Sequence, residues 1–67
     1  MDDRQFEAAM ESIVAALKER GYDPYAQLYG YITENEPTYI TSHKGARGLI
    51  QTLDFDKVEH YVQEMKR

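Results

Sequence analysis

Apolar side chains recur at helical spacing over the first third of the chain. They lie three and four positions apart, as on one face of an α-helix, at Phe6, Ala9, Met10, Ile13 and Leu17. Acidic residues precede this stripe and basic residues end it, which complements the dipole of a helix. Gly21 follows, and glycine readily adopts the left-handed conformation that closes a helix. The pattern predicts a first helix over residues 3–20.

A second helical stripe follows a strong start signal. Asp23 can cap free backbone N–H groups, and Pro24 is preferred at the first helical position. The stripe then continues at Tyr25, Leu28, Tyr29 and Ile32, which predicts a helix to about Glu34. Gly30 inside it costs about 1 kcal/mol relative to alanine, which suggests that another backbone approaches closely there.

The remaining third of the chain predicts two more helices after a short link. Residues 38–41 are predicted to be extended, and Thr41 or Ser42 is expected to cap a third helix with a stripe at Ala46, Leu49, Ile50 and Leu53. Asp54 opens a fourth helix, whose apolar face contains Phe55, Val58, Tyr61, Val62 and Met65. The predicted fold class is therefore all-α, with one four-helix domain over residues 1–67.

Length and composition change this picture in one respect, the expected oligomeric state. The chain has 67 residues, no cysteine and two histidines, so we expect no disulfide, no metal site and no cofactor. A single core of this size rarely supplies more than about 3–5 kcal/mol. Six tyrosines and two phenylalanines offer aromatic surface for self-association. We therefore expect a homodimer held by the aromatic and aliphatic faces of the first, second and fourth helices.

The net charge of −4 narrows the class of partner. An acidic chain does not favour nucleic acid or an anionic membrane as a binding partner. No apolar run approaches the ~20 residues of a transmembrane helix, and no signal peptide opens the sequence. The expected location is the cytoplasm.

The sequence offers little that resembles a catalytic site. Ser42 and His43 are adjacent, and neighbours on a helix diverge by about 100°. Asp54 and Asp56 are better explained as acids in the first turn of a helix than as a catalytic pair. We therefore expect a protein that is not an enzyme.

A small basic group is the clearest candidate for binding. His43, Lys44 and Arg47 fall at the predicted start of the third helix, where free N–H groups favour an anion such as a phosphate, a carboxylate or an acidic peptide. The alternative is a solvated helical face with Arg47 paired to an acid such as Glu36. A second alternative is a helix-turn-helix in which Lys44 and Arg47 face a DNA groove, although the link is longer than the usual 3–4-residue turn.

The run from Gly21 to Leu53 is more specific than these patterns. Its first part fits the form G-Y-N/D-P-x-x-Q-I/L-x-G-Y-L, with Gly21-Tyr22-Asp23-Pro24, Gln27-Leu28 and Gly30-Tyr31-Ile32. Its second part resembles D-P-x-Y-I-T-S-H-x-x-A-R-x-L-I, with Glu36-Pro37-Thr38-Tyr39-Ile40-Thr41-Ser42-His43, Ala46-Arg47 and Leu49-Ile50. Together they resemble the signature of the IreB family of regulatory phosphoproteins, over about half the chain.

The resemblance implies a small helical homodimer from Gram-positive bacteria that regulates rather than catalyses. Members of the family are associated with a membrane Ser/Thr kinase and phosphatase pair in cell-envelope stress. Their phosphoacceptor threonines lie in an N-terminal tail, whereas residues 1–11 here contain no Ser, Thr or Tyr, as expected of a shortened member. A second departure is Phe55-Asp56-Lys57, where the family usually has an Arg-Asp/Glu run.

The resemblance also favours a functional interpretation of the basic group. We predict an exposed surface that binds a protein partner, a component of a Ser/Thr kinase pathway, and that consists of Tyr31, Tyr39, His43, Lys44 and Arg47. On this hypothesis Arg47→Ala leaves the fold intact and abolishes partner binding.

Overall fold

The first helix, α1, spans Asp3–Glu19, close to its predicted range, and is capped at both ends. The structure is a computed structural model that describes residues 2–66. Asp2 and Gln5 form a capping box, in which the Gln5 N–H donates to Asp2 Oδ1 at 2.8 Å and the Asp2 N–H donates to Gln5 Oε1 at 3.3 Å. Gly21 closes the helix with a φ of +83°, and the Tyr22 N–H donates to the Leu17 carbonyl at 3.0 Å.

Aspartate caps also define the second and fourth helices, and both predictions are confirmed. Helix α2 spans Pro24–Glu34, with the Asp23 carboxylate accepting hydrogen bonds from the N–H groups of the first turn. Helix α4 spans Phe55–Met65, and Asp54 caps it in the same way. Asn35, with a φ of +50°, ends α2 in the left-handed conformation.

The link after α2 begins with a turn, and the prediction of an extended segment over residues 38–41 is wrong for residues 38 and 39. Residues Pro37–Tyr39 form a single 3₁₀ turn, η1, because Pro37 fixes a helical φ and the Glu36 side chain accepts a hydrogen bond from the Thr38 N–H at 3.3 Å. Ile40, which follows the turn, is extended.

The third helix begins later than its sequence predicts. Helix α3 spans Ala46–Gln51, and a second 3₁₀ turn, η2, spans His43–Gly45 before it. Lys44 and Gly45 both have left-handed backbones, with φ of +54° and +74°, so a continuous helix from Ser42 is impossible. The N-cap of α3 is Gly45, so the prediction that Thr41 or Ser42 caps this helix is wrong; Thr41 Oγ1 instead accepts a hydrogen bond from the His43 N–H at 3.1 Å.

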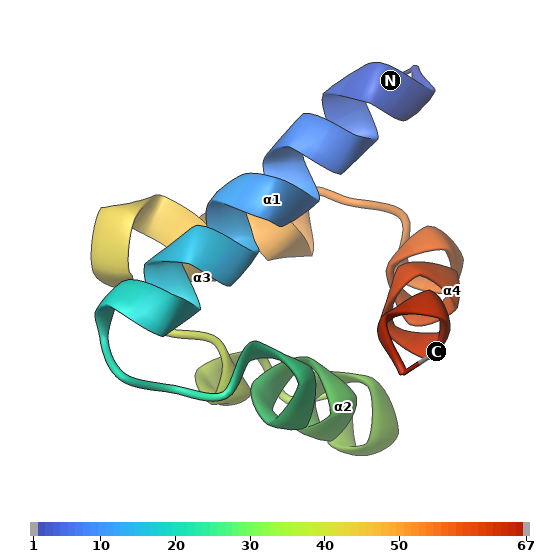
Figure 1. The fold of residues 1–67 in the computed structure, drawn as a ribbon. Coiled ribbons are helices and arrows are strands. Elements are labelled where there is room, and N and C mark those ends of the chain that lie inside the picture. The colour runs from blue at the N-terminus through green and yellow to red at the C-terminus, as the bar shows by residue number, and fades with distance from the viewer. Residues whose placement is uncertain (1, 67) are drawn as a thin grey trace.

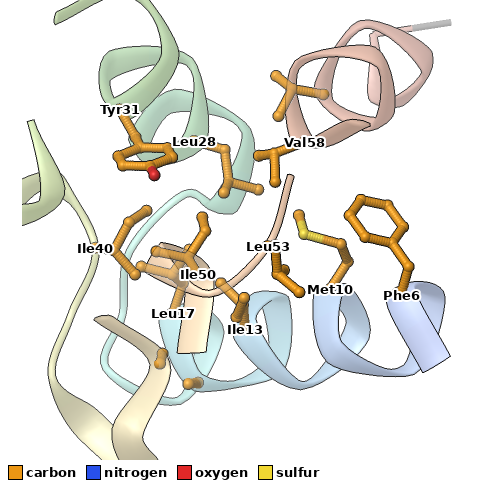
Figure 2. Close-up of a cluster of buried hydrophobic side chains, with 13 residues drawn as sticks. Phe6, Met10, Ile13, Leu17, Leu28, Tyr31, Ile40, Ile50, Leu53 and Val58 are labelled. Carbon is orange, nitrogen blue, oxygen red and sulfur yellow. The ribbon is translucent and has the colours of Figure 1, made fainter. Parts of the chain in front are cut away.

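The helices pack in two pairs around one apolar core. Helix α1 packs mainly on α3, and α2 packs mainly on α4 (Figure 1). Figure 2 shows side chains from all four helices and the link pointing into the core. Its buried members are Phe6, Met10, Ile13, Ala16, Leu17, Leu28, Tyr31, Ile40, Ala46, Ile50, Leu53, Val58 and Val62.

The predicted all-α class is confirmed for residues 2–66, which form four α-helices and no strand. Within the same residues, no helix has both the length and the apolar composition needed to cross a bilayer.

Candidate partner-binding surface

The η1 turn rests on α2 through one aromatic ring and one hydrogen bond. The ring of Tyr39 lies directly on Gly30, where a Cβ atom would come within 2.6 Å of two ring carbons. The Gln27 side chain donates from Nε2 to the Tyr39 carbonyl at 2.9 Å. Gly30 therefore does permit a close approach, but the group that approaches is an aromatic ring, and the prediction of a backbone was wrong.

Arg47 holds the next residue of the link. Its Nε donates to the Ile40 carbonyl at 2.8 Å, and the Ile40 side chain is fully buried. Gln27 and Arg47 thus bind two consecutive carbonyls, those of residues 39 and 40, from two different helices. Within residues 2–66 no ion pair joins Arg47 to Glu36, whose side chain instead accepts from the Thr38 N–H. The half-buried guanidinium of Arg47 therefore holds the link in place and is also partly exposed at the surface.

A cluster of one acidic and two basic side chains ties η2 to the end of α1. Glu19 Oε1 lies 2.9 Å from His43 Nε2 and 3.1 Å from Lys44 Nζ. The hydrogen bond from His43, followed by that from Lys44, lowers the pKa of the Glu19 carboxyl below its ordinary value. All three side chains are at least partly exposed, so their Coulomb attraction is screened by water.

Four of the five predicted binding residues therefore lie on neighbouring segments. We call Tyr39, His43, Lys44 and Arg47 the link surface. Tyr31 is not part of it, and its prediction as an exposed residue is wrong: it is only 6% exposed and points from α2 into the core (Figure 2). Its ring packs on that of Phe55 at a centroid distance of 5.7 Å, and burial raises the pKa of its hydroxyl.

A known protein family matches nearly the whole chain, including the segments that build this surface. The model of the family described as IreB regulatory phosphoprotein matches residues 1–65 of the chain. The chain belongs to the IreB family. The match covers α1 and α2, with their caps and apolar faces, and also the link surface. In this IreB-family chain Ser12 is the first hydroxyl side chain among residues 2–66, and it is exposed on α1.

The geometry changes the chemistry expected of the basic group. His43 and Lys44 lie in η2 before α3 and contact Glu19, so of the basic group it is Arg47 that lies in the first turn of an α-helix. The α3 helix of this IreB-family chain has six residues, and its N-cap is Gly45. Ala46 and Ile50 of this short helix are buried in the core, and nothing in the described residues favours the helix-turn-helix alternative. The link surface instead combines an exposed aromatic ring with a cationic group that is partly neutralised.

Sequence reasoning missed two residues that shape the link surface. Glu19 had one signal, because an acidic residue in the last turn of a helix opposes the helix dipole and so needs another partner. Gln27 belongs to the IreB pattern, but its role appears only when η1 lies against α2.

Proposed function

We propose that this chain is a non-enzymatic regulatory adaptor that binds a protein partner through the link surface. Its membership of a regulatory phosphoprotein family supports the regulatory role. The proposed process is cell-envelope stress signalling linked to a Ser/Thr kinase, and the proposed place of action is the cytoplasm.

One observation carries this proposal: the link is held at several points while its side chains stay accessible. Gln27 and Arg47 fix the two carbonyls, and Gly30 makes room for the Tyr39 ring. The Tyr39 residue nevertheless remains 37% exposed and the Lys44 side chain 63% exposed. A preorganised surface loses little entropy on binding, and tyrosine is enriched at protein interfaces.

The proposed adaptor is a homodimer, and exposed aromatic surface on α2 supports this. A groove of about 380 Å³ runs between α2 and α4, with Tyr25, Tyr29 and Ile32 on one side and Val62 on the other. Tyr29 is 53% exposed and lies against Tyr25 with ring centroids 5.9 Å apart. Covering these rings with a second copy would remove apolar surface from water.

The test of partner binding compares two variants that each remove one lysine charge. Lys44→Asn removes one cation from the link surface and keeps Arg47, and asparagine tolerates the left-handed backbone at this position. Lys18→Gln removes a charge from the exposed face of α1 and serves as the matched control. Each tagged variant is used for capture from a native lysate, with quantitative mass spectrometry of the retained proteins.

The proposal predicts that a component of a Ser/Thr kinase pathway is retained by the wild type and by Lys18→Gln, and is depleted with Lys44→Asn. Equal retention of that component by all three proteins would show that the partner does not bind through the link surface. Size-exclusion chromatography with light scattering tests the dimer separately, because wild type should elute at twice the mass of the chain and Tyr29→Asp at the monomer mass.

A further inference from the structure

A second groove lies between the first turns of α1 and the helix α4. It encloses about 610 Å³ and its surface is mainly apolar. Phe6 of α1 and Tyr61 of α4 form its floor, with their rings edge to face at a centroid distance of 6.1 Å. The rim includes the acidic residues Asp3 and Glu7 from α1 and Asp56 from α4. A volume of this size is in the range of sites that take up ligand side chains.

The groove is open because of how the helices pair. Helix α1 packs on α3 and α4 packs on α2, and the first turns of α1 extend past the other helices (Figure 1). Phe6 lies at the end of the row of core side chains on α1, beside Met10 (Figure 2). The groove therefore continues the hydrophobic core outward to the surface.

The charges around the groove favour a cationic ligand. The Asp3 side chain is 94% exposed, and Glu7 and Asp56 are exposed as well. Of these three, Glu7 also acts on the floor: the pKa of the Tyr61 hydroxyl is raised first by burial and then by the negative charges of Glu11 and Glu7. Lys57 and His60 are the basic residues that line the groove, so acidic side chains outnumber basic ones around it.

The chain itself shows how a cation fits this groove. Lys57 Nζ lies 5.8 Å from the centroid of the Phe6 ring and 3.6 Å from Asp3 Oδ1. An ammonium group between an aromatic face and a carboxylate gains from both. Glu7 and Asp56 have no ion-pair partner among residues 2–66, so they remain available for further cations.

We propose that this groove binds a basic amphipathic segment of a partner protein. An aliphatic or aromatic side chain of that segment would cover Tyr61 and the small exposed part of Phe6, and its lysines or arginines would contact Asp3, Glu7 and Asp56. The site goes beyond the proposed function, because it lies at the start of α1 whereas Glu19 anchors the link surface at the end of the same helix. An experiment can therefore refute binding at one surface without refuting binding at the other.

The probe is a fluorescein-labelled synthetic helix with leucine at positions i, i+3, i+4 and i+7 and with arginine on the flanks. Its control has the same composition in scrambled order, so that it keeps the charge and loses the apolar face. Fluorescence anisotropy gives the affinity, and amide NMR shifts of the labelled protein give the location. We expect the patterned peptide to shift the amide NMR signals of residues 3–7 and 56–61. The scrambled peptide should bind much more weakly.

Two charge reversals at exposed glutamates complete the test. Glu7→Lys should weaken binding of the patterned peptide roughly five- to tenfold, because it replaces an attraction with a repulsion. Glu34→Lys makes the same charge change on α2, away from the groove, and should leave the affinity unchanged. Lys44→Asn should also bind normally, which separates this site from the link surface.

Three results would overturn the proposal. Equal weakening by Glu7→Lys and Glu34→Lys would show that only net charge matters. Peptide shifts centred on Tyr39 and Lys44 would place binding elsewhere. If the amide signals of the groove residues shift with protein concentration in the absence of peptide, the groove is instead covered by a second copy of the chain.

Discussion

Substitution of Gly30 by alanine tests whether the Tyr39 ring fixes the link on α2. A Cβ at position 30 would lie 2.6 Å from ring carbons Cδ1 and Cε1 of Tyr39 and 3.1 Å from Cγ, whereas ordinary contact begins at 3.4 Å. The ring must move away from the helix. The Gln27 side chain holds the backbone carbonyl of Tyr39, so the ring must move by rotating about its side-chain bonds and lose its contact with the helix.

Two opposing effects set the magnitude. Alanine inside a helix is worth about 1 kcal/mol more than glycine. Forcing extra volume into a packed contact costs about 1–3 kcal/mol. In the wild-type background Gly30→Ala should therefore change the free energy of unfolding by roughly 0–2 kcal/mol in the destabilising direction. In a Tyr39→Ala background the contact is gone, so the same change should stabilise by about 1 kcal/mol.

A double-mutant cycle measured by urea unfolding, with circular dichroism at the helix band, gives both numbers. The expected coupling between positions 30 and 39 is about 1–3 kcal/mol. The reasoning is refuted if Gly30→Ala stabilises the wild type as much as it stabilises Tyr39→Ala, because the ring would then exert no restraint on the helix.

Three further predictions concern single side chains. Arg47→Ala should lower the free energy of unfolding by about 1–3 kcal/mol in urea titrations, because the Ile40 carbonyl loses its hydrogen-bond donor; an unchanged midpoint would show that Arg47 acts only on the surface. Glu19 has a folded pKa below its ordinary 4.5, so its stabilising effect is present above that pH and is lost as pH falls through the folded value. In thermal melts the advantage of wild type over Glu19→Gln should therefore shrink on acidification, and a constant difference would contradict the cluster. The pKa of Tyr31 is raised above 10.0, so its stability contribution is present below pH 10.0 and is lost as pH rises through the folded value. Tyr31→Phe should reduce this alkaline loss of stability, as followed by urea unfolding at rising pH, and identical alkaline profiles would argue against burial of the hydroxyl.

The sequence predicted the three longer helices correctly because their capping hydrogen bonds join residues that are close together in the chain. Asp23 and Asp54 bind N–H groups two and three residues ahead, so the sequence around them contains the whole interaction. The third helix had no such signal. Its start depends on left-handed backbones at Lys44 and Gly45, and lysine seldom adopts that conformation.

The candidate site was predicted in part for a related reason. Tyr29 and Tyr31 lie on different faces of α2, and Leu28 is compatible with a stripe through either one. Tyrosine suits a core or a surface, so periodicity alone does not choose between them. The contacts made by Gln27 and Glu19 join segments far apart in the chain, and only the folded structure brings these groups together.

Photocrosslinking from the link surface tests the central claim most directly. Benzoylphenylalanine is placed at Tyr39 in one protein and, as the matched control, at Tyr22, an exposed tyrosine in the turn between α1 and α2. Both proteins are produced in the native host and irradiated, and the products are separated by mass. The account predicts that position 39 yields a crosslink to a second protein and that position 22 does not. A crosslink from position 22 with none from position 39 would contradict the assignment of partner binding to this surface.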